Sequence, residues 1–518
     1  MPVPSFDTEK FLLMVGNVFR RRKALWAILA ISLVARIALV LKGGQFYYPD
    51  ETRYLNSLYF LHYLARFDLR TASDLVLGTG AHVGFIFAGV PAAIVHIVYL
   101  GIRGLPETQA SAVATAWVSG LCFAVPSVIS IAMVYAISRR AAATSAEALL
   151  AAFLMACSNA MFYYCRHFLP YDLSMALALF SLWLGIAEKT TRWVSLRCGL
   201  ILGIAMLTYN GCWITGAVVL AFHVLYRVPS AAAAVERAVL AALAAISPLA
   251  VLTAMSVLLG KEPYLSLMRR FAGAVNQGDF REGAVFPFLY LWHTEYAVAL
   301  AWAATTLLAL WYCRTEDWRR RPFIPLCIGA IVATYGLLVL GSVGLGVFVV
   351  MGRSVRQLVP WLCFTSAYGI ARAFHQGSRY RIALAAICVG LVTQAAYNMS
   401  HPFRQRFPAE VRQAVHSRYG NVDYDVSFHG PPVDGSQASP FSTYVLVNAQ
   451  MLYPLLSWKA PFSGDVLFSV PHPYAYPPYQ YEGLNPRERD LLLQGDYSMR
   501  LIRRSPQPGN SQQSPKRP

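Results

Sequence analysis

Two adjacent acidic residues, Asp50 and Glu51, are the side chains of this sequence best suited to acid–base chemistry. They follow Pro49 and precede Arg53 and Tyr54. Proline suits the first turn of a helix, and the helix dipole favours acidic side chains there. A carboxylate fixed in that position could serve as a general base. The structural alternative is a pair of helix-capping acids with an ordinary surface ion pair.

A second charged cluster occupies positions 166–172, between two long apolar segments. Arg166 and Asp172 lie on either side of Pro170, which again suits the start of a helix. Charged side chains beside a bilayer core are costly unless they are paired or functional. The cluster therefore indicates either a structural pair of Arg166 with Asp172 or a contact with a substrate.

Further basic residues gather in two later loops. Guanidinium groups pair with phosphate oxygens in bidentate fashion, so outward-facing arginines at a membrane boundary suit an anionic lipid headgroup. Each of them taken alone could equally be a solvated or snorkelling charge. The residues are Lys261, Arg269, Arg270, Arg281, Arg353 and Arg356.

The composition shows what kind of protein must position these side chains. The chain has 518 residues, of which 56% are hydrophobic and 14% are charged, whereas soluble domains carry about 25% charged residues. Its apolar residues fall into blocks of about twenty, the length that crosses a bilayer as a helix. This pattern excludes a set of soluble domains and predicts an all-α polytopic membrane protein.

Charge and cysteine usage restrict the function further. Basic residues outnumber acidic ones 44 to 26, and basic cytoplasmic loops explain this excess better than nucleic-acid binding does. None of the nine cysteines lies beyond residue 400, and no CxxC motif occurs. We therefore expect neither a disulfide framework nor a structural zinc site.

Hydropathy predicts about eleven transmembrane helices. Twelve candidate segments are present, but if all of them crossed, Arg139 and the arginines at 319–321 would face outside, against the positive-inside rule. If 83–102, which contains Pro91, lies at the outer interface or only dips into the bilayer, every basic cluster faces the cytoplasm. The candidates are 24–41, 83–102, 111–137, 146–165, 171–187, 194–209, 212–226, 238–259, 288–312, 323–341, 357–374 and 382–399.

This topology places the N-terminus in the cytoplasm and divides the chain into three parts. Residues 1–399 form the membrane domain, whose first outer loop, 42–110, contains an amphipathic pattern of leucines after Tyr54 that predicts an interfacial helix. Residues 400–504, with short apolar runs at 444–447 and 466–470, predict a small extracytoplasmic α+β or loop-rich domain. Residues 505–518 contain only polar residues, glycine and proline and predict a disordered tail.

The residues at 49–54, Pro-Asp-Glu-Thr-Arg-Tyr, resemble the signature of the aminoarabinose transferases that modify lipid A. More generally, residues 20–400 resemble the polyprenyl-phosphate-dependent glycosyltransferases of the GT-C fold, which include the protein O-mannosyltransferases. Arg166 and Asp172 look like the second landmark of that superfamily. The stretch from Arg356 to Pro360 looks like the start of one of its late spans.

This resemblance implies an inverting transfer of a sugar from a polyprenyl-phosphate donor to an acceptor hydroxyl on the extracytoplasmic face of a plasma or bacterial inner membrane. Asp50 would be the general base, and Glu51 would orient the acceptor. The acceptor stays open between a lipid, a glycan and a protein, because Ala81 and His82 stand where the lipid A enzymes have a proline motif. A divalent cation near the carboxylates is compatible with this reaction, but no metal-ligand spacing supports one. The implied substrate-binding residues are Arg53, Tyr54, Arg166, Asp172, Lys261, Arg269, Arg270, Arg353 and Arg356.

The alternative is a transporter or flippase of lipid-linked glycans, which would also have many spans and outward arginines. Internal repeats and charges along the middle of several spans would favour it. No repeat is evident in the sequence, and the acidic residues gather in one outer loop. An O-antigen-type polymerase or ligase would need a large late loop, whereas 342–356 is short. The sequence therefore favours a membrane glycosyltransferase without a nucleic-acid partner.

Overall fold

The computed structural model describes most of the membrane domain and four strands of the tail. Arg281, the arginines at 319–321 and the tail at 505–518 lie outside the described part of the chain. The described residues are 8–45, 49–78, 83–105, 111–112, 115–187, 191–275, 284–315, 322–344, 352–374, 378–400, 417–418, 424–427, 444–448, 464–470 and 499–504.

The described part of the first half is built from helices joined by short turns. Capping residues mark several helix starts; for example, the Thr144 hydroxyl accepts a hydrogen bond from the backbone N–H of Glu147 at 3.2 Å. The elements are α1 (Thr8–Leu41), the 3₁₀ turn η1 (Pro49–Tyr54), α2 (Leu55–Ala65), α3 (Leu69–Leu77), α4 (Val83–Ile102), α6 (Ala116–Arg140), α7 (Ser145–Cys157), α8 (Asn159–Tyr164), α9 (Tyr171–Gly185), α10 (Arg192–Thr208), η2 (Asn210–Cys212) and α11 (Trp213–Leu225).

The second half continues in the same way up to residue 400. Its elements are α12 (Ala231–Leu258), α13 (Tyr264–Val275), α14 (Phe286–Glu295), α15 (Ala297–Thr315), α16 (Phe323–Val339), the π turn η3 (Leu340–Gly344), α17 (Gly352–Val355), η4 (Arg356–Leu358), α18 (Val359–Phe374) and α19 (Ser378–Ser400).

The chain is a helical membrane protein. Four of its described helices are long and apolar enough to cross a membrane: α1 from Lys23 onward, α4, α6 and α12. Six further apolar segments of 10–17 residues coincide with other predicted spans. The number of helices that cross and the orientation of the chain remain predictions, and α4 meets the same criteria of length and composition as the other three.

Two of the predicted spans are broken helices. The segment 146–165 divides at Ser158, whose extended backbone (φ −63°, ψ 121°) separates α7 from α8. The segment 288–312 divides at Tyr296, which has a positive φ of 47° between α14 and α15. The two breaks meet, because the Glu295 carboxylate accepts hydrogen bonds from the backbone N–H groups of Asn159 and Ala160 at 3.0 and 2.8 Å. This carboxylate satisfies the otherwise unpaired donors at the start of α8.

Small residues allow α10 and α12 to pack closely against each other. A Cβ atom added to Gly199 of α10 would lie 2.0 Å from the carbonyl oxygen of Ala241 in α12. One added to Gly203, a helical turn later, would lie 2.2 Å from the carbonyl oxygen of Ala245. Glycines four positions apart allow membrane helices to approach this closely. This contact fixes α12 against the rest of the bundle.

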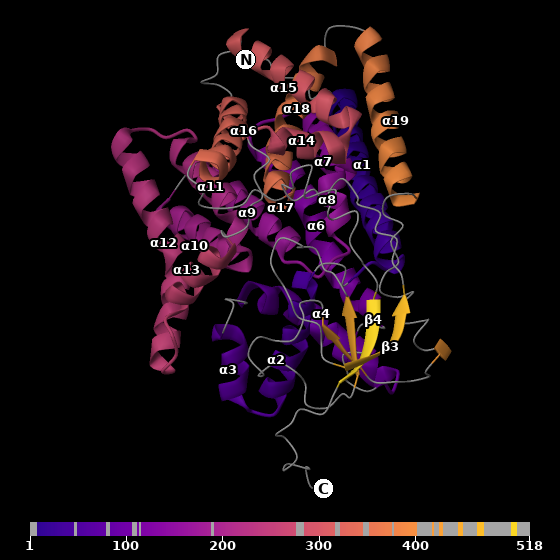
Figure 1. Ribbon diagram of the computed structural model, residues 1–518. Helices are drawn as coiled ribbons and strands as arrows, with labels where there is room; N and C mark the ends of the chain where they lie inside the picture. Colours follow the sequence, from indigo (N-terminus) through magenta and orange to yellow (C-terminus); the bar gives the residue numbers. More distant parts are fainter. Residues whose placement is uncertain are drawn as a thin grey trace, which may run out of the picture.

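The four strands form one sheet in the order β1-β2-β4-β3. The two short apolar runs of the C-terminal region coincide with β2 (Tyr444–Asn448) and β3 (Gly464–Val470), while β1 (Tyr424–Ser427) and β4 (Met499–Arg504) complete the sheet. Strand β4 pairs antiparallel with both β2 and β3. Figure 1 shows the sheet at the same end of the helical bundle as α2 and α3, with α15, α16 and α18 toward the opposite end.

Candidate functional site

The carboxylate of Asp50 lies between two arginines. Nη1 of Arg353 donates a hydrogen bond to Oδ2 of Asp50 at 2.9 Å, although the two residues are 303 positions apart. Nη1 of Arg53 lies 3.2 Å from Oδ1 of the same carboxylate. The side chain of Asp50 keeps 23% of its surface exposed. Asp50 is therefore a charge-paired carboxylate that still reaches the protein surface.

The helix start predicted at Pro49 is present as η1, with Asp50 and Glu51 in its first turn. Arg353 arrives from α17, where Gly352 allows a close approach to α14. A Cβ atom added to Gly352 would lie 2.1 Å from the ring of Tyr290. The site is thus assembled from the segment that follows α1 and the segment that precedes α18.

Arg353 also contacts a tyrosine, Tyr171. Nη1 of Arg353 also donates to the hydroxyl of Tyr171 at 2.8 Å, and the guanidinium carbon lies 5.8 Å from the centre of that ring. Tyr171 is the first residue of α9. Our sequence prediction did not include Tyr171, and the only available signal was its place between Pro170 and Asp172.

Glu51 faces the protein interior, in contrast to the expectation that it would orient an acceptor. It has no exposed surface. Its carboxylate accepts a hydrogen bond from Nδ1 of His167 at 2.9 Å and another from the backbone N–H of Phe168 at 3.0 Å. Glu51 therefore joins η1 to the turn between α8 and α9, next to Asp50.

The histidine in this pair is neutral. Burial lowers the pKa of His167, and the adjacent Glu51 only partly opposes this effect. Nε of Arg166 donates to Nε2 of His167 at 3.3 Å, so Nε2 is an acceptor and the proton of the neutral ring is on Nδ1. The tautomer fits the hydrogen bond to Glu51. Arg166 is buried and is connected to Glu51 through His167.

Asp172 forms a buried ion pair with Arg356, which lies 184 positions later. The sequence had suggested an Arg166–Asp172 pair. In the structure the partner of Asp172 is Arg356, and the pair joins α9 to η4. Both side chains are at most 5% exposed, and a buried pair of this kind is costly to break on one side only. Arg356 and Asp172, which were expected to contact the substrate, instead contact each other and hold α9 against η4.

Three buried arginines lie over the three consecutive aromatic rings at the end of α8. A guanidinium over an aromatic face is attracted by the ring quadrupole, which partly compensates its burial. The pairs and their distances to the ring centre are Arg36 with Phe162 at 5.2 Å, Arg166 with Tyr163 at 4.9 Å, and Arg356 with Tyr164 at 4.9 Å.

Tyr54, which the resemblance implied as a substrate-binding residue, is part of the core. Only 1% of it is exposed. Its hydroxyl bonds with Ser119 and lies 3.1 Å from Nδ1 of His96, and Nε2 of His96 lies 2.6 Å from the hydroxyl of Thr115. This polar network ties η1 to α4 and α6. Arg53, in turn, lies over the ring of Phe85 at 5.0 Å.

The remaining predicted cations belong to a different part of the surface. Lys261 pairs with Asp74 of α3 at 2.6 Å and donates to Ser73 at 2.7 Å. Arg270 pairs with Glu262 at 2.8 Å, and Arg269 is exposed on α13. Lys261 thus joins the segment before α13 to α3, whereas the contacts of Asp50 come from η1 and α17.

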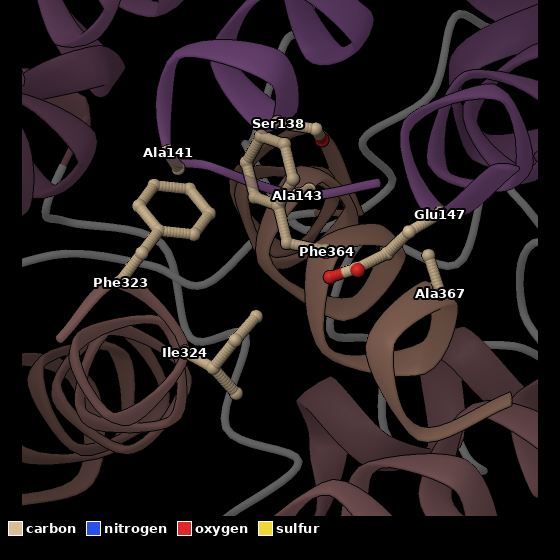
Figure 2. Close-up of a pocket in the computed structure, with 8 residues that line it drawn as sticks. All are labelled: Ser138, Ala141, Ala143, Glu147, Phe323, Ile324, Phe364 and Ala367. Atoms are coloured by element: carbon tan, nitrogen blue, oxygen red, sulfur yellow. The ribbon is translucent and has the colours of Figure 1, made fainter. Parts of the chain in front are cut away.

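The pocket shown in Figure 2 is separate from Asp50. It lies among α6, α7, α16 and α18, where Glu147 stands beside Phe364 and Ala367. Most of its lining is apolar, and Glu147 is already engaged as a helix cap. The lining residues are Ser138, Ala141, Ala143, Glu147, Phe323, Ile324, Phe364 and Ala367.

Within the described residues, no group of three or more histidine, cysteine, aspartate or glutamate side chains could hold a metal ion. The chemistry that the Asp50 site can perform without one is proton abstraction by a carboxylate and stabilisation of an anion by two guanidiniums. No protein-family model and no curated protein matches the sequence.

Proposed function

We propose that the protein is an integral membrane glycosyltransferase that moves a sugar from a polyprenyl-phosphate donor to a hydroxyl of a lipid, glycan or protein acceptor. The observation that carries this proposal is the partly exposed carboxylate of Asp50, held between Arg53 and Arg353. This arrangement supports the proposal, because a carboxylate that can accept a proton lies beside guanidiniums that can pair with a phosphate. The resemblance of residues 49–54 to the lipid A aminoarabinose transferases supports the same chemistry.

The reaction is a single displacement. Asp50 takes the proton of the acceptor hydroxyl as its oxygen forms a bond to the anomeric carbon. At the same time the bond from that carbon to the phosphate oxygen breaks, and the polyprenyl phosphate leaves with the electron pair. Arg353, with help from Arg53, stabilises the charge that develops on the phosphate. One displacement inverts the anomeric centre.

The finer architecture belongs to the same proposal. We propose a GT-C fold with about eleven spans, a cytoplasmic N-terminus and an extracytoplasmic C-terminal domain in a plasma or bacterial inner membrane. The short helices α2 and α3, which follow η1 directly, support an interfacial first loop. In this topology Asp50 lies at the outer membrane boundary, where a prenyl-linked headgroup would be.

The substitution Asp50→Asn tests the proposal, because it keeps the shape of the side chain and removes the base. The purified protein is incubated with a panel of polyprenyl-phosphate sugars and no added acceptor, so that water takes the place of the acceptor hydroxyl. Release of the polyprenyl phosphate by this slow hydrolysis is measured. We expect turnover to fall by about 10²–10⁴-fold, the usual contribution of a general base. Asp68→Asn is the matched control: Asp68 caps α3 through the backbone N–H of Thr71 at 3.0 Å, and asparagine caps equally well.

Full activity of the Asp50→Asn variant would refute the assignment. A flippase would instead move a labelled lipid-linked glycan across a vesicle membrane without consuming it. Transport that is independent of Asp50, together with no release of polyprenyl phosphate from any donor, would favour that alternative.

A further inference from the structure

Tyr171 contacts Arg353 but has no role in the reaction proposed above. Nη1 of an arginine carries two hydrogens. In Arg353 this nitrogen donates to Oδ2 of Asp50 at 2.9 Å and to the hydroxyl of Tyr171 at 2.8 Å. The place of the guanidinium relative to the carboxylate therefore depends on where the tyrosine hydroxyl stands.

The packing of the tyrosine ring fixes that hydroxyl. Tyr171 is 5% exposed, and its ring centre lies 4.5 Å from that of Tyr209 and 5.8 Å from that of Tyr164. Tyr209 is in turn held over Gly211, where an added Cβ atom would lie 2.4 Å from its ring. The ring of Tyr171 thus packs against aromatic neighbours as well as against the arginine.

Resting on the proposed function, we propose that Tyr171 is a positioning residue of the transferase, whose hydroxyl holds Arg353 across Asp50 in the orientation that receives the phosphate of the donor. An arginine side chain is long and rich in rotamers, so each hydrogen bond to a fixed partner restricts where its guanidinium lies. The hydrogen bond to Tyr171 adds such a restriction before the donor binds. Tyr171 itself touches neither the donor nor the acceptor in this scheme.

Two kinetic consequences distinguish this role from simple packing. Loss of the hydroxyl should raise the KM for the donor about 10-fold, the scale of a lost hydrogen bond to a charged group. It should also lower kcat, because Arg353 stabilises the charge on the departing phosphate. The acid limb of the pH profile should also move to higher pH, because a cation held at a carboxylate favours its ionised form. Within the described residues, the groups that face Asp50 include Arg53 on η1, Arg353 on α17 and the hydroxyl of Tyr171 on α9, while Glu51 contacts His167.

The test compares Tyr171→Phe with Tyr209→Phe, which removes the same atom from the ring that packs against Tyr171. We expect the KM increase and the pH shift in Tyr171→Phe and neither in Tyr209→Phe. Unchanged KM and pH profile in Tyr171→Phe would overturn the inference. The Asp50→Asn result then decides the proposed function separately, since a transferase can lose activity with Asp50→Asn whether or not Tyr171 matters.

A double-mutant cycle with Arg353→Lys shows whether the hydroxyl acts through the arginine. Lysine keeps the charge, but its compact ammonium is one bond closer to Cα than Nη1 is, so it does not reach the position between the two acceptors. If Tyr171 acts through Arg353, the additional substitution Tyr171→Phe should change KM little in the Arg353→Lys background. If Tyr171→Phe raised KM equally in the unmodified protein and in Arg353→Lys, the positioning role would be contradicted. This comparison holds even if Tyr171→Phe lowers stability, because the loss of stability would be the same in both proteins.

Discussion

The carboxylate of Glu51 accepts a hydrogen bond at 2.9 Å from Nδ1 of His167, which lies 116 positions later, and neither side chain is exposed. This contact connects the first turn after α1 to the turn between α8 and α9. The residue next to Asp50 is therefore anchored in the bundle. A partly exposed carboxylate and its anchor are adjacent in sequence, but they face opposite environments.

We expect Glu51→Gln to destabilise the protein by about 1–3 kcal/mol, the cost of leaving a buried polar group unsatisfied. The glutamine NH₂ group would face either the imidazole N–H or the N–H of Phe168, and both of these are donors. Thermal unfolding in detergent measures the effect. Glu236→Gln is the control, because it removes an exposed pair with Arg192 that should contribute less than about 1 kcal/mol. Equal unfolding temperatures for the two variants would contradict this prediction.

Acidification should weaken the fold partly through His167. Burial lowers the pKa of this histidine in the folded protein, so the unfolded chain binds a proton that the folded chain does not as the pH falls through about 6.5. Stability therefore rises with pH in the window just below 6.5 and is lost as the pH decreases. Unfolding temperatures measured between about pH 5 and 8 should fall less steeply for His167→Gln than for the unmodified protein. Parallel curves would show that His167 does not contribute to the pH dependence.

The contact between α10 and α12 should not tolerate a larger residue. Gly203→Leu places a side chain where an added Cβ would already lie 2.2 Å from the carbonyl oxygen of Ala245, so the helices must separate. We expect a loss of at least about 1–3 kcal/mol from overpacking, measured as the unfolding temperature in detergent. Gly329→Leu on α16 is the control, because nothing lies within 4 Å of the added atom. A stable Gly203→Leu variant would mean that this contact does not hold α12 in place.

The sequence was sufficient to predict the helical membrane architecture and the local geometry around Pro49. Both features depend on neighbouring residues: apolar blocks about as long as a bilayer is thick, and acids in the first turn of a helix. The apolar runs at 444–447 and 466–470 are visible in the sequence, but the sequence leaves open whether they form strands or loops. The break at Tyr296 was not, because it depends on how α14 and α15 pack against other helices.

Partners distant in the sequence could not be predicted. Asp172 was expected either to pair with Arg166 or to contact a substrate, but its partner is Arg356, which comes 184 positions later. Tyr54 and Glu51 belong to the same short motif as Asp50, and the sequence pattern does not show that they are buried while Asp50 is not. Tyr54 is buried by α4 and α6, and Glu51 is buried by the turn between α8 and α9, all of which are distant in the sequence.

The contacts of three arginines with three consecutive rings of α8 limit which changes in sequence length this region can tolerate. Consecutive residues of a helix point about 100° apart, so Phe162, Tyr163 and Tyr164 each address a cation from a different direction. An insertion or deletion of one residue between Ser158 and Phe162 would rotate all three rings away from their cations at once. Length variation among evolved or engineered versions of this protein should therefore be absent from this stretch, even where single substitutions are accepted.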